Sequence, residues 1–321
     1  MSPHRGSAGS LFRPFYTSHF KGPAREPVYH PDDGYLRMYL RGRAINFFSP
    51  SDLTEYEVRS PLPAPDDKLR LEWVYGYRGK DSRNNLLLLP TGEIVYYIAS
   101  VVVLYSAADH SQRHYLAHTA EVKCMTLHPN KTVIATGQAA GVDRRERRLS
   151  GNGCTADMED ITQLLAHVRV WDTVTLHTLH VIGIGLFERG IACLAFSKEG
   201  HGGQHLCIVD EAPEHNLSIW EWSRGDKGTK ITESKSGLEQ VVAVEFHPVD
   251  IGTIVSCGRG HISIWHLDGG GALTRKLGVF DTKQEKAKFM LCLALTETGD
   301  CWSGDSAGNV WVWPRGSNKD G

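Results

Sequence analysis

The sequence predicts an all-β fold, a β-propeller with about five blades, on the basis of two observations. Trp171, Trp220, Trp265 and Trp313 follow one another at intervals of 49, 45 and 48 residues, and a period of about 40 to 50 residues is typical of four-stranded propeller blades. Each tryptophan also closes a short run such as His-Val-Arg-Val-Trp, in which apolar and polar residues alternate as in a half-buried strand. We expect an incomplete ring of a larger propeller.

Composition excludes several classes of function. The 321 residues carry 35 Lys and Arg against 37 Asp and Glu, a net charge of −2, which does not favour nucleic acid or an anionic membrane as a partner. No apolar run is long enough to span a bilayer. The seven cysteines form no Cys-x-x-Cys pair, so reduced thiols are expected rather than a disulfide framework or a zinc site. We predict no cofactor and no metal.

The N-terminal third divides into two parts. Residues 1–34 are rich in Pro, Gly, Ser and His and predict a disordered segment. Residues 35–113 form one block that contains two early strands, a connector broken by prolines, and a divergent first blade over 69–113. The strands expected in this block lie at 35–40, 44–48, 86–89, 94–98 and 101–105.

Four further blades are expected over 114–315, before a disordered tail at 316–321. The second blade has strands at 122–127 and 133–136, and a glycine-rich, polar insertion at about 141–165 delays its closing strand. Loops tolerate such length at little cost. The remaining blades repeat one order of apolar strand, turn, apolar strand, turn and tryptophan strand, over about 178–224, 229–269 and 273–315.

One histidine is a candidate for a structural hydrogen bond. His118 precedes the first strand of its blade, and it can reach the hydroxyl group of Thr136 and, through it, Trp171. This structural role is favoured over a catalytic one because buried polar groups are usually hydrogen-bonded. Ala117-His118 and Trp171-Asp172 resemble the Gly-His and Trp-Asp marks of WD repeats. Trp220, Trp265 and Trp313 take the same place in later copies, followed there by Glu, His and Pro.

The N-terminal block carries a more specific resemblance. Met-Tyr-Leu-Arg-Gly-Arg at 38–43, Leu-Glu-Trp-Val-Tyr-Gly-Tyr-Arg-Gly-Lys-Asp at 71–81 and Leu-Pro-Thr-Gly-Glu-Ile-Val-Tyr-Tyr at 89–97 are similar to the hydrophobic motif of echinoderm microtubule-associated protein-like proteins. The resemblance extends over about 35–315. It implies a non-catalytic protein that binds tubulin or microtubules and influences their organisation, in the cytoplasm and on the microtubule cytoskeleton, including the mitotic spindle.

The chain departs from that family in two respects. Members carry tandem propellers, and many carry an N-terminal coiled coil that makes trimers. This sequence contains no heptad pattern, so self-trimerisation is not expected. It ends after about five blades, so we expect it to be a fragment of a longer protein, an alternative product or an incomplete gene model, and marginally stable alone.

Two other functional classes remain open at this stage. The chain could be a general WD scaffold or adaptor that binds a protein other than tubulin through its propeller surfaces. Gly-Asp-Ser-Ala-Gly at 304–308 matches the Gly-x-Ser-x-Gly motif of serine hydrolases, but Ser306 precedes another strand and no histidine follows it, so a turn is favoured.

In the insertion, Arg144, Arg145, Arg147 and Arg148 form a basic cluster that could contact an acidic partner, although a solvated loop is the simpler interpretation.

Overall fold

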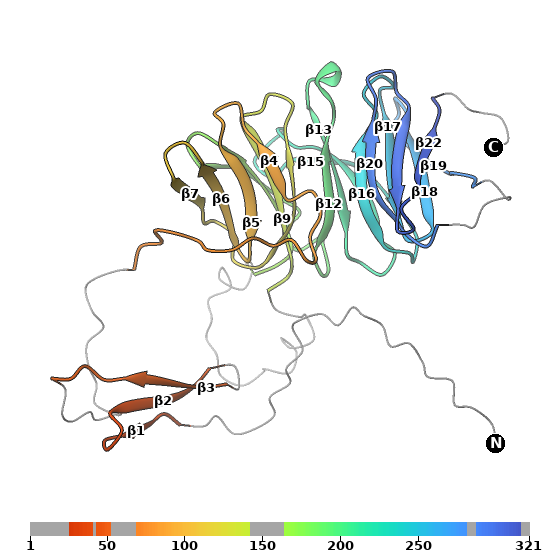
Figure 1. Ribbon diagram of the computed structural model, residues 1–321. Coiled ribbons are helices and arrows are strands. Elements are labelled where there is room, and N and C mark those ends of the chain that lie inside the picture. Colours follow the sequence, from red (N-terminus) through yellow and green to blue (C-terminus); the bar gives the residue numbers. More distant parts are fainter. Residues whose placement is uncertain (1–25, 41–42, 53–68, 142–163, 281–286, 316–321) are drawn as a thin grey trace, which may run out of the picture. The chain divides into compact units, whose positions relative to one another are not determined.

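The structure is a computed structural model that describes residues 26–40, 43–52, 69–141, 164–280 and 287–315 (Figure 1). Residues 1–25, most of the insertion at 142–163 and the tail at 316–321 lie outside this part. The chain divides into two units, Met1–Arg70 and Leu71–Gly321. No helix in the described ranges is long and apolar enough to cross a membrane.

The first unit contains a three-stranded antiparallel sheet. Its strands β1 (Val28–His30), β2 (Tyr35–Leu40) and β3 (Arg43–Phe48) pair in sequence order. β1 falls within the segment that was expected to be disordered. It is ordered by pairing with β2, and the ring of His30 lies 4.6 Å from that of Tyr35. The block expected over 35–113 is therefore split, because β2 and β3 belong to this unit.

The second unit contains five antiparallel sheets. The first sheet has strands β4 (Leu86–Leu88), β5 (Ile94–Ile98), β6 (Val101–Ser106) and β7 (Ser111–Tyr115), and the second has β8 (Val122–Leu127), β9 (Val133–Gln138), β10 (Val168–Asp172) and β11 (Thr178–Ile182). The third has β12 (Ile191–Phe196), β13 (His205–Asp210), β14 (Asn216–Glu221) and β15 (Thr229–Lys235), with a short 3-10 turn η1 (Glu199–His201). The fourth has β16 (Val241–Phe246), β17 (Thr253–Gly258), β18 (His261–Leu267) and β19 (Leu273–Leu277), and the fifth has β20 (Met290–Leu295), β21 (Cys301–Asp305) and β22 (Val310–Trp313).

Consecutive sheets of this unit pack face to face, as propeller blades do. The first strands of neighbouring sheets contact one another, β8 with β12, β12 with β16 and β16 with β20. Four apolar clusters fill the four layers between the five sheets. The fold is therefore all-β and a WD-type propeller. Within the described ranges, no extensive contact joins the first sheet to the fifth, so no closed ring is seen.

Each tryptophan of the repeat fills the layer between its own sheet and the preceding one. Trp171 lies in the cluster between the first and second sheets, and Trp265 in that between the third and fourth. Both side chains are fully buried. Large rings at this position seal the layer because no smaller side chain would fill the space.

Four first strands share an irregularity in their pairing with the second strand. The register shifts between Val122 and Cys124, between Ile191 and Cys193, between Val241 and Ala243, and between Met290 and Cys292. An extra residue of this kind bends a strand and increases its twist. The repeats therefore match in backbone detail as well as in tryptophan spacing.

The sheets are offset from the repeat ranges expected from the sequence. The expected ranges beginning at 178, 229 and 273 each open with a fourth strand, β11, β15 or β19, which pairs with the sheet before it. The boundary expected at 113/114 likewise cuts β7. These outer strands are less buried than the inner ones, and β15 and β19 are mostly exposed, so their sequences carry little apolar signal to place them.

The two outermost faces of this unit expose apolar side chains. Leu86 and Leu88 on β4 are exposed, as are Trp302, Val310 and Val312 on the last sheet.

The described cysteines are reduced, and most of them are buried as expected. Cys292 is exposed, against that expectation; the other five are buried, and none of the six forms a disulfide. Cys154 lies outside the described residues.

Candidate functional site

The antiparallel sheets give the propeller two ends with different connections. At one end, which we call the connecting end, lie the connections from each sheet to the next and the turns between the second and third strands of each sheet. The turns between first and second strands, and between third and fourth strands, lie at the opposite end. Because loops carry most binding residues, these two ends are the candidate interaction surfaces.

His118, Thr136 and Trp171 form one chain of hydrogen bonds near the connecting end. The indole Nε1 of Trp171 donates to Thr136 Oγ1 at 3.2 Å, and Thr136 Oγ1 lies 2.6 Å from His118 Nε2. His118 Nδ1 lies 2.8 Å from Gln138 Oε1. Because that amide oxygen only accepts, Nδ1 carries the proton and Nε2 accepts from the threonine hydroxyl. The side chains of His118, Thr136 and Trp171 are buried. Each has a hydrogen-bond partner within the chain, so a structural role explains all three.

The other three tryptophans of the repeat also donate to a hydroxyl group. Trp265 Nε1 lies 2.9 Å from Ser256 Oγ, and Trp313 Nε1 lies 2.8 Å from Ser303 Oγ. Both serines take the second-strand position of Thr136. The third sheet has Ile208 there, and Trp220 instead donates at 2.9 Å to Ser218 on its own strand. These serines were missed from the sequence. The signal would have been a hydroxyl residue on the second strand opposite the residue two before the tryptophan, as for Ser256 and Ser303, or at that residue itself, as for Ser218.

Asp172 takes no part in the His118 chain. Its Oδ1 accepts hydrogen bonds from the backbone of Val174 and Thr175 and from the Thr175 hydroxyl, which closes the β10–β11 turn at the opposite end. The backbone hydrogen bond from Thr175 is the largest influence that holds the pKa of Asp172 below its usual range. The aspartate of the Trp-Asp mark is therefore a turn residue in this chain.

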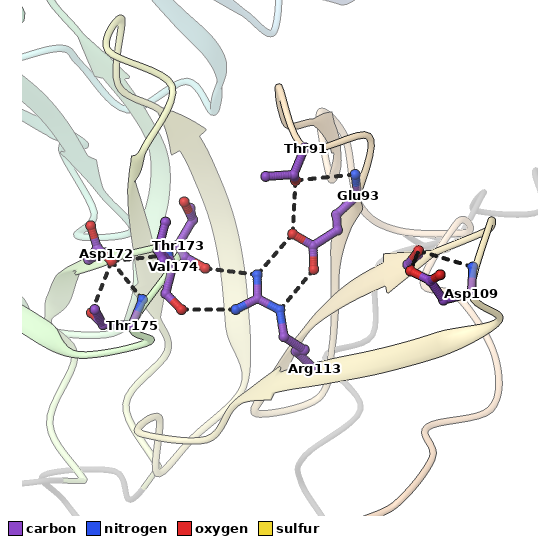
Figure 2. A network of polar contacts seen from close by, with 9 residues as sticks. Thr91, Glu93, Asp109, Arg113, Asp172, Thr173, Val174 and Thr175 are labelled. Carbon is purple, nitrogen blue, oxygen red and sulfur yellow. Dashed lines mark hydrogen bonds and ion pairs between the residues drawn. The ribbon is translucent and has the colours of Figure 1, made fainter.

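An arginine joins the first two sheets at the opposite end (Figure 2). Arg113 on β7 binds both carboxylate oxygens of Glu93 at 2.8 and 2.9 Å, and it also donates to the carbonyl oxygens of Thr173 and Val174 at 2.9 and 3.0 Å. The bidentate arrangement lowers the pKa of Glu93, chiefly through the Arg113 hydrogen bonds. A guanidinium suits this place because its planar donors can serve several acceptors at once.

Two sequence candidates have different outcomes in the structure. Arg144, Arg145, Arg147 and Arg148 lie outside the described residues; the described edges of the insertion meet through a hydrogen bond from Gly141 N to Leu164 O at 2.7 Å. Ser306 lies in the turn between strands β21 and β22, where its amide donates to Phe289 O. A nucleophile elbow requires a strand followed by a helix, so the motif here is a β-turn. No metal-binding group of His, Cys, Asp or Glu is found in the described ranges.

Two buried histidines make the stability of this fold sensitive to acid. Burial lowers the pKa of His118 to about 3 and that of His167 to about 4, whereas an unfolded histidine titrates near about 6.5. As the pH falls through 6.5, the unfolded chain takes up protons that the folded chain does not. We expect the free energy of unfolding to fall by roughly 2 kcal/mol for each histidine between pH 7 and pH 5, measured by urea denaturation.

The matched variants for this prediction are His118→Gln and His266→Gln. The first removes a buried titrating group, so the loss of stability between pH 7 and pH 5 should shrink. The second changes an exposed histidine and should leave that loss unchanged. Identical pH dependence in the two variants would show that His118 does not remain neutral in the folded state.

Comparison with known proteins gives consistent matches over most of the chain. A family model described as "Echinoderm microtubule-associated protein first beta-propeller" matches residues 111–320, and one described as "HELP motif" matches 64–103. Echinoderm microtubule-associated protein-like 1 of Rattus norvegicus is 48% identical over 92% of this chain. Echinoderm microtubule-associated protein-like 4 of Mus musculus is 51% identical over 88%, and the 77 kDa echinoderm microtubule-associated protein of Lytechinus variegatus is 44% identical over 99%.

These relatives are much longer than this chain. The aligned region is 34% of the rat protein, 26% of the mouse protein and 44% of the sea urchin protein. Among solved structures, the WD40 β-propeller domain of Doa1 gives a TM-score of 0.47 at 14% identity, covering 72% of this chain and 62% of that domain.

Proposed function

The chain belongs to the echinoderm microtubule-associated protein-like family, and from that premise we propose that it is a non-catalytic protein that binds tubulin and influences microtubule organisation. The proposal places it in the cytoplasm, on microtubules. One observation carries the proposal: the HELP-motif match at 64–103 adjoins the propeller match at 111–320, and a general WD scaffold does not need the first of these. The relatives that share both segments are named as microtubule-associated proteins.

The described part of the motif supports the proposal because it is built into the propeller: it supplies β4, β5 and the start of β6, and its residues 73–77 pack against that first sheet. Val74 pairs with the side chain of Gln112 on β7, its amide donating to Oε1 at 2.8 Å and its carbonyl accepting from Nε2 at 3.2 Å. The Trp73 ring lies 6.1 Å from that of Tyr105, and the Tyr77 ring 5.8 Å from that of Tyr96. A segment held this way belongs to the folded propeller and presents exposed Tyr75 to solvent.

Sedimentation velocity of the chain with and without soluble αβ-tubulin tests the proposal. We expect a discrete species that moves into a faster complex when tubulin is added. An unrelated WD40 propeller of similar size serves as the control and should not shift. A discrete species that ignores tubulin would contradict the proposal and leave the general scaffold, with a different protein partner, as the better interpretation.

A further inference from the structure

The fifth sheet has one face that remains open in the described part of the second unit. We call the side of a sheet that is turned toward the next sheet along the chain its forward face. The forward face of the fifth sheet consists of six residues in two rows across the strands: Ala294, Trp302 and Val312 in one row, and Cys292, Gly304 and Val310 in the other. None of the six is charged, and all except the glycine are exposed. A contiguous apolar face of this kind is typical of an interaction surface.

In the second, third and fourth sheets the forward face is buried. Ala135, Cys207 and Val255 take the second-strand position of Trp302, and each is at most 3% exposed because the next sheet covers it. In each of these three layers, the next sheet brings the tryptophan of its third strand into the same apolar cluster. A small residue on the forward face therefore leaves room for the ring of the next sheet.

Trp302 departs from this pattern, because it places a large ring where the other three forward faces carry a small side chain. The Trp302 side chain is 47% exposed. A further sheet with a tryptophan on its facing side would meet Trp302 in the space that its own ring needs, and overpacking of this kind is destabilising. The surface that covers this face must instead offer a hollow that receives an indole ring.

The same face contains a hollow at Gly304. Its equivalent in the second sheet is Gly137, where the third sheet fills the space, since a Cβ atom added to Gly137 would lie 2.6 Å from Cβ of Ile191. A Cβ atom added to Gly304 would meet only the Sγ atom of Cys292, at 2.9 Å, within 4 Å. Cys292 belongs to the same face, so in the described ranges no other sheet supplies a side chain to this hollow.

The ring and the hollow make the face complementary to itself. Trp302 and Gly304 lie two residues apart on β21, so they point to the same side of the sheet. A twofold axis midway between two such faces, perpendicular to the strands and passing at Ser303, places Trp302 of each copy opposite Gly304 of the other. The outer strands then oppose Val312 to Val310, so that apolar side chains meet throughout and no charge is buried.

We propose that the chain forms a symmetric dimer through the forward faces of its two fifth sheets, with Trp302 of each copy seated at Gly304 of the other. The face spans only three strands. We therefore expect the buried area to lie at the low end of the range of about 1,200 to 2,000 Å² for specific interfaces, with a Kd of roughly 1 to 100 µM. The dimer is independent of the tubulin proposal, because the face belongs to neither end of the propeller.

Sedimentation equilibrium of the purified chain between about 1 and 200 µM tests the dimer, since this range covers the expected Kd. We expect one reversible equilibrium between monomer and dimer. A monomer throughout this range would overturn the proposal. Species that continue to grow beyond the dimer would also overturn it, because they would show that the face contacts a different surface of the next copy in a head-to-tail assembly.

Two valine variants connect the dimer to this face. Val310 and Val174 are each 65% exposed, so replacing either by glutamate should change the free energy of unfolding by no more than about 1 kcal/mol. Val310→Glu places two carboxylates inside the interface and should raise the Kd of the dimer at least about tenfold. Val174→Glu is the matched control in the β10–β11 turn and should keep the Kd of the parent chain. The same Kd in both variants would contradict the proposal.

Alkylation of Cys292 gives a second measurement at the same face. Cys292 is exposed, whereas the other five described cysteines are buried. Its modification by iodoacetamide, followed by peptide mass mapping, should slow as the protein concentration rises through the Kd, because the dimer covers the thiol. In Trp302→Ala, which lacks the ring that fills the hollow, the rate should not depend on concentration. A concentration-independent rate in the parent chain would place any dimer on a different surface and overturn the proposal.

Discussion

Replacing Trp171 by alanine should lower the free energy of unfolding by about 3 to 5 kcal/mol. The side chain is fully buried, and its ring stacks on Tyr115 with centroids 4.4 Å apart and planes 9° from parallel. Removing it leaves a cavity in the layer between the first two sheets and takes the indole N–H from Thr136. Guanidinium denaturation of the variant and the parent chain measures the change.

Two further variants separate the contributions to that loss. Trp171→Phe keeps a ring in the layer but loses the donor, so it should cost less than alanine. Trp302→Ala removes a tryptophan that is 47% exposed on the last sheet, and it should change stability by no more than about 1 kcal/mol. Equal losses for Trp171→Ala and Trp302→Ala would contradict the assignment of Trp171 to the core.

Replacing Gly258 by alanine should cost about 3 kcal/mol, although it adds only one methyl group. A Cβ atom at this residue would lie 1.8 Å from the carbonyl oxygen of Gln240, far inside van der Waals contact. That same oxygen accepts the Arg259 amide at 2.9 Å, so the backbone cannot move away without losing a hydrogen bond. The expected loss of stability combines crowding with the weakened bond.

Gly269→Ala is the matched control for this substitution. Gly269 lies in the turn between β18 and β19, and an added Cβ would meet nothing within 4 Å. Its stability should remain within about 0.5 kcal/mol of the parent chain. If the two variants melt at the same temperature, the close approach of residues 240 and 258 does not exist in solution.

The parts of the fold that the sequence predicted are those with a strong local pattern. The strands of the first blade and the tryptophan strands combine apolar residues with a regular period, and the family and fold are both confirmed. β1 was missed because Val28–His30 is short and lies among prolines and glycines, and only its pairing with β2 makes it a strand. The fourth strands were placed in the following repeat because exposed strands such as β15 carry polar residues.

Some residues of the candidate site could also be predicted from a local pattern in the sequence, and others could not. His118, Thr136 and Trp171 lie within one repeat, so their spacing pointed to a contact. Ser218 could not be found by analogy with Thr136, because the third sheet supplies its hydroxyl from the neighbouring strand.

The shifted register shared by four first strands does not depend on one particular side chain. The side chains at the shift differ, three cysteines and one alanine, and the hydroxyl partner of the tryptophan has moved between strands. The extra residue itself is present in the second, third, fourth and fifth sheets alike. The four sheets therefore share the path of the backbone at this place, whereas the residues that bind the tryptophan N–H differ from sheet to sheet. The same bend is compatible with different side chains, so substitutions at the shift are expected to be tolerated better than an insertion or a deletion there.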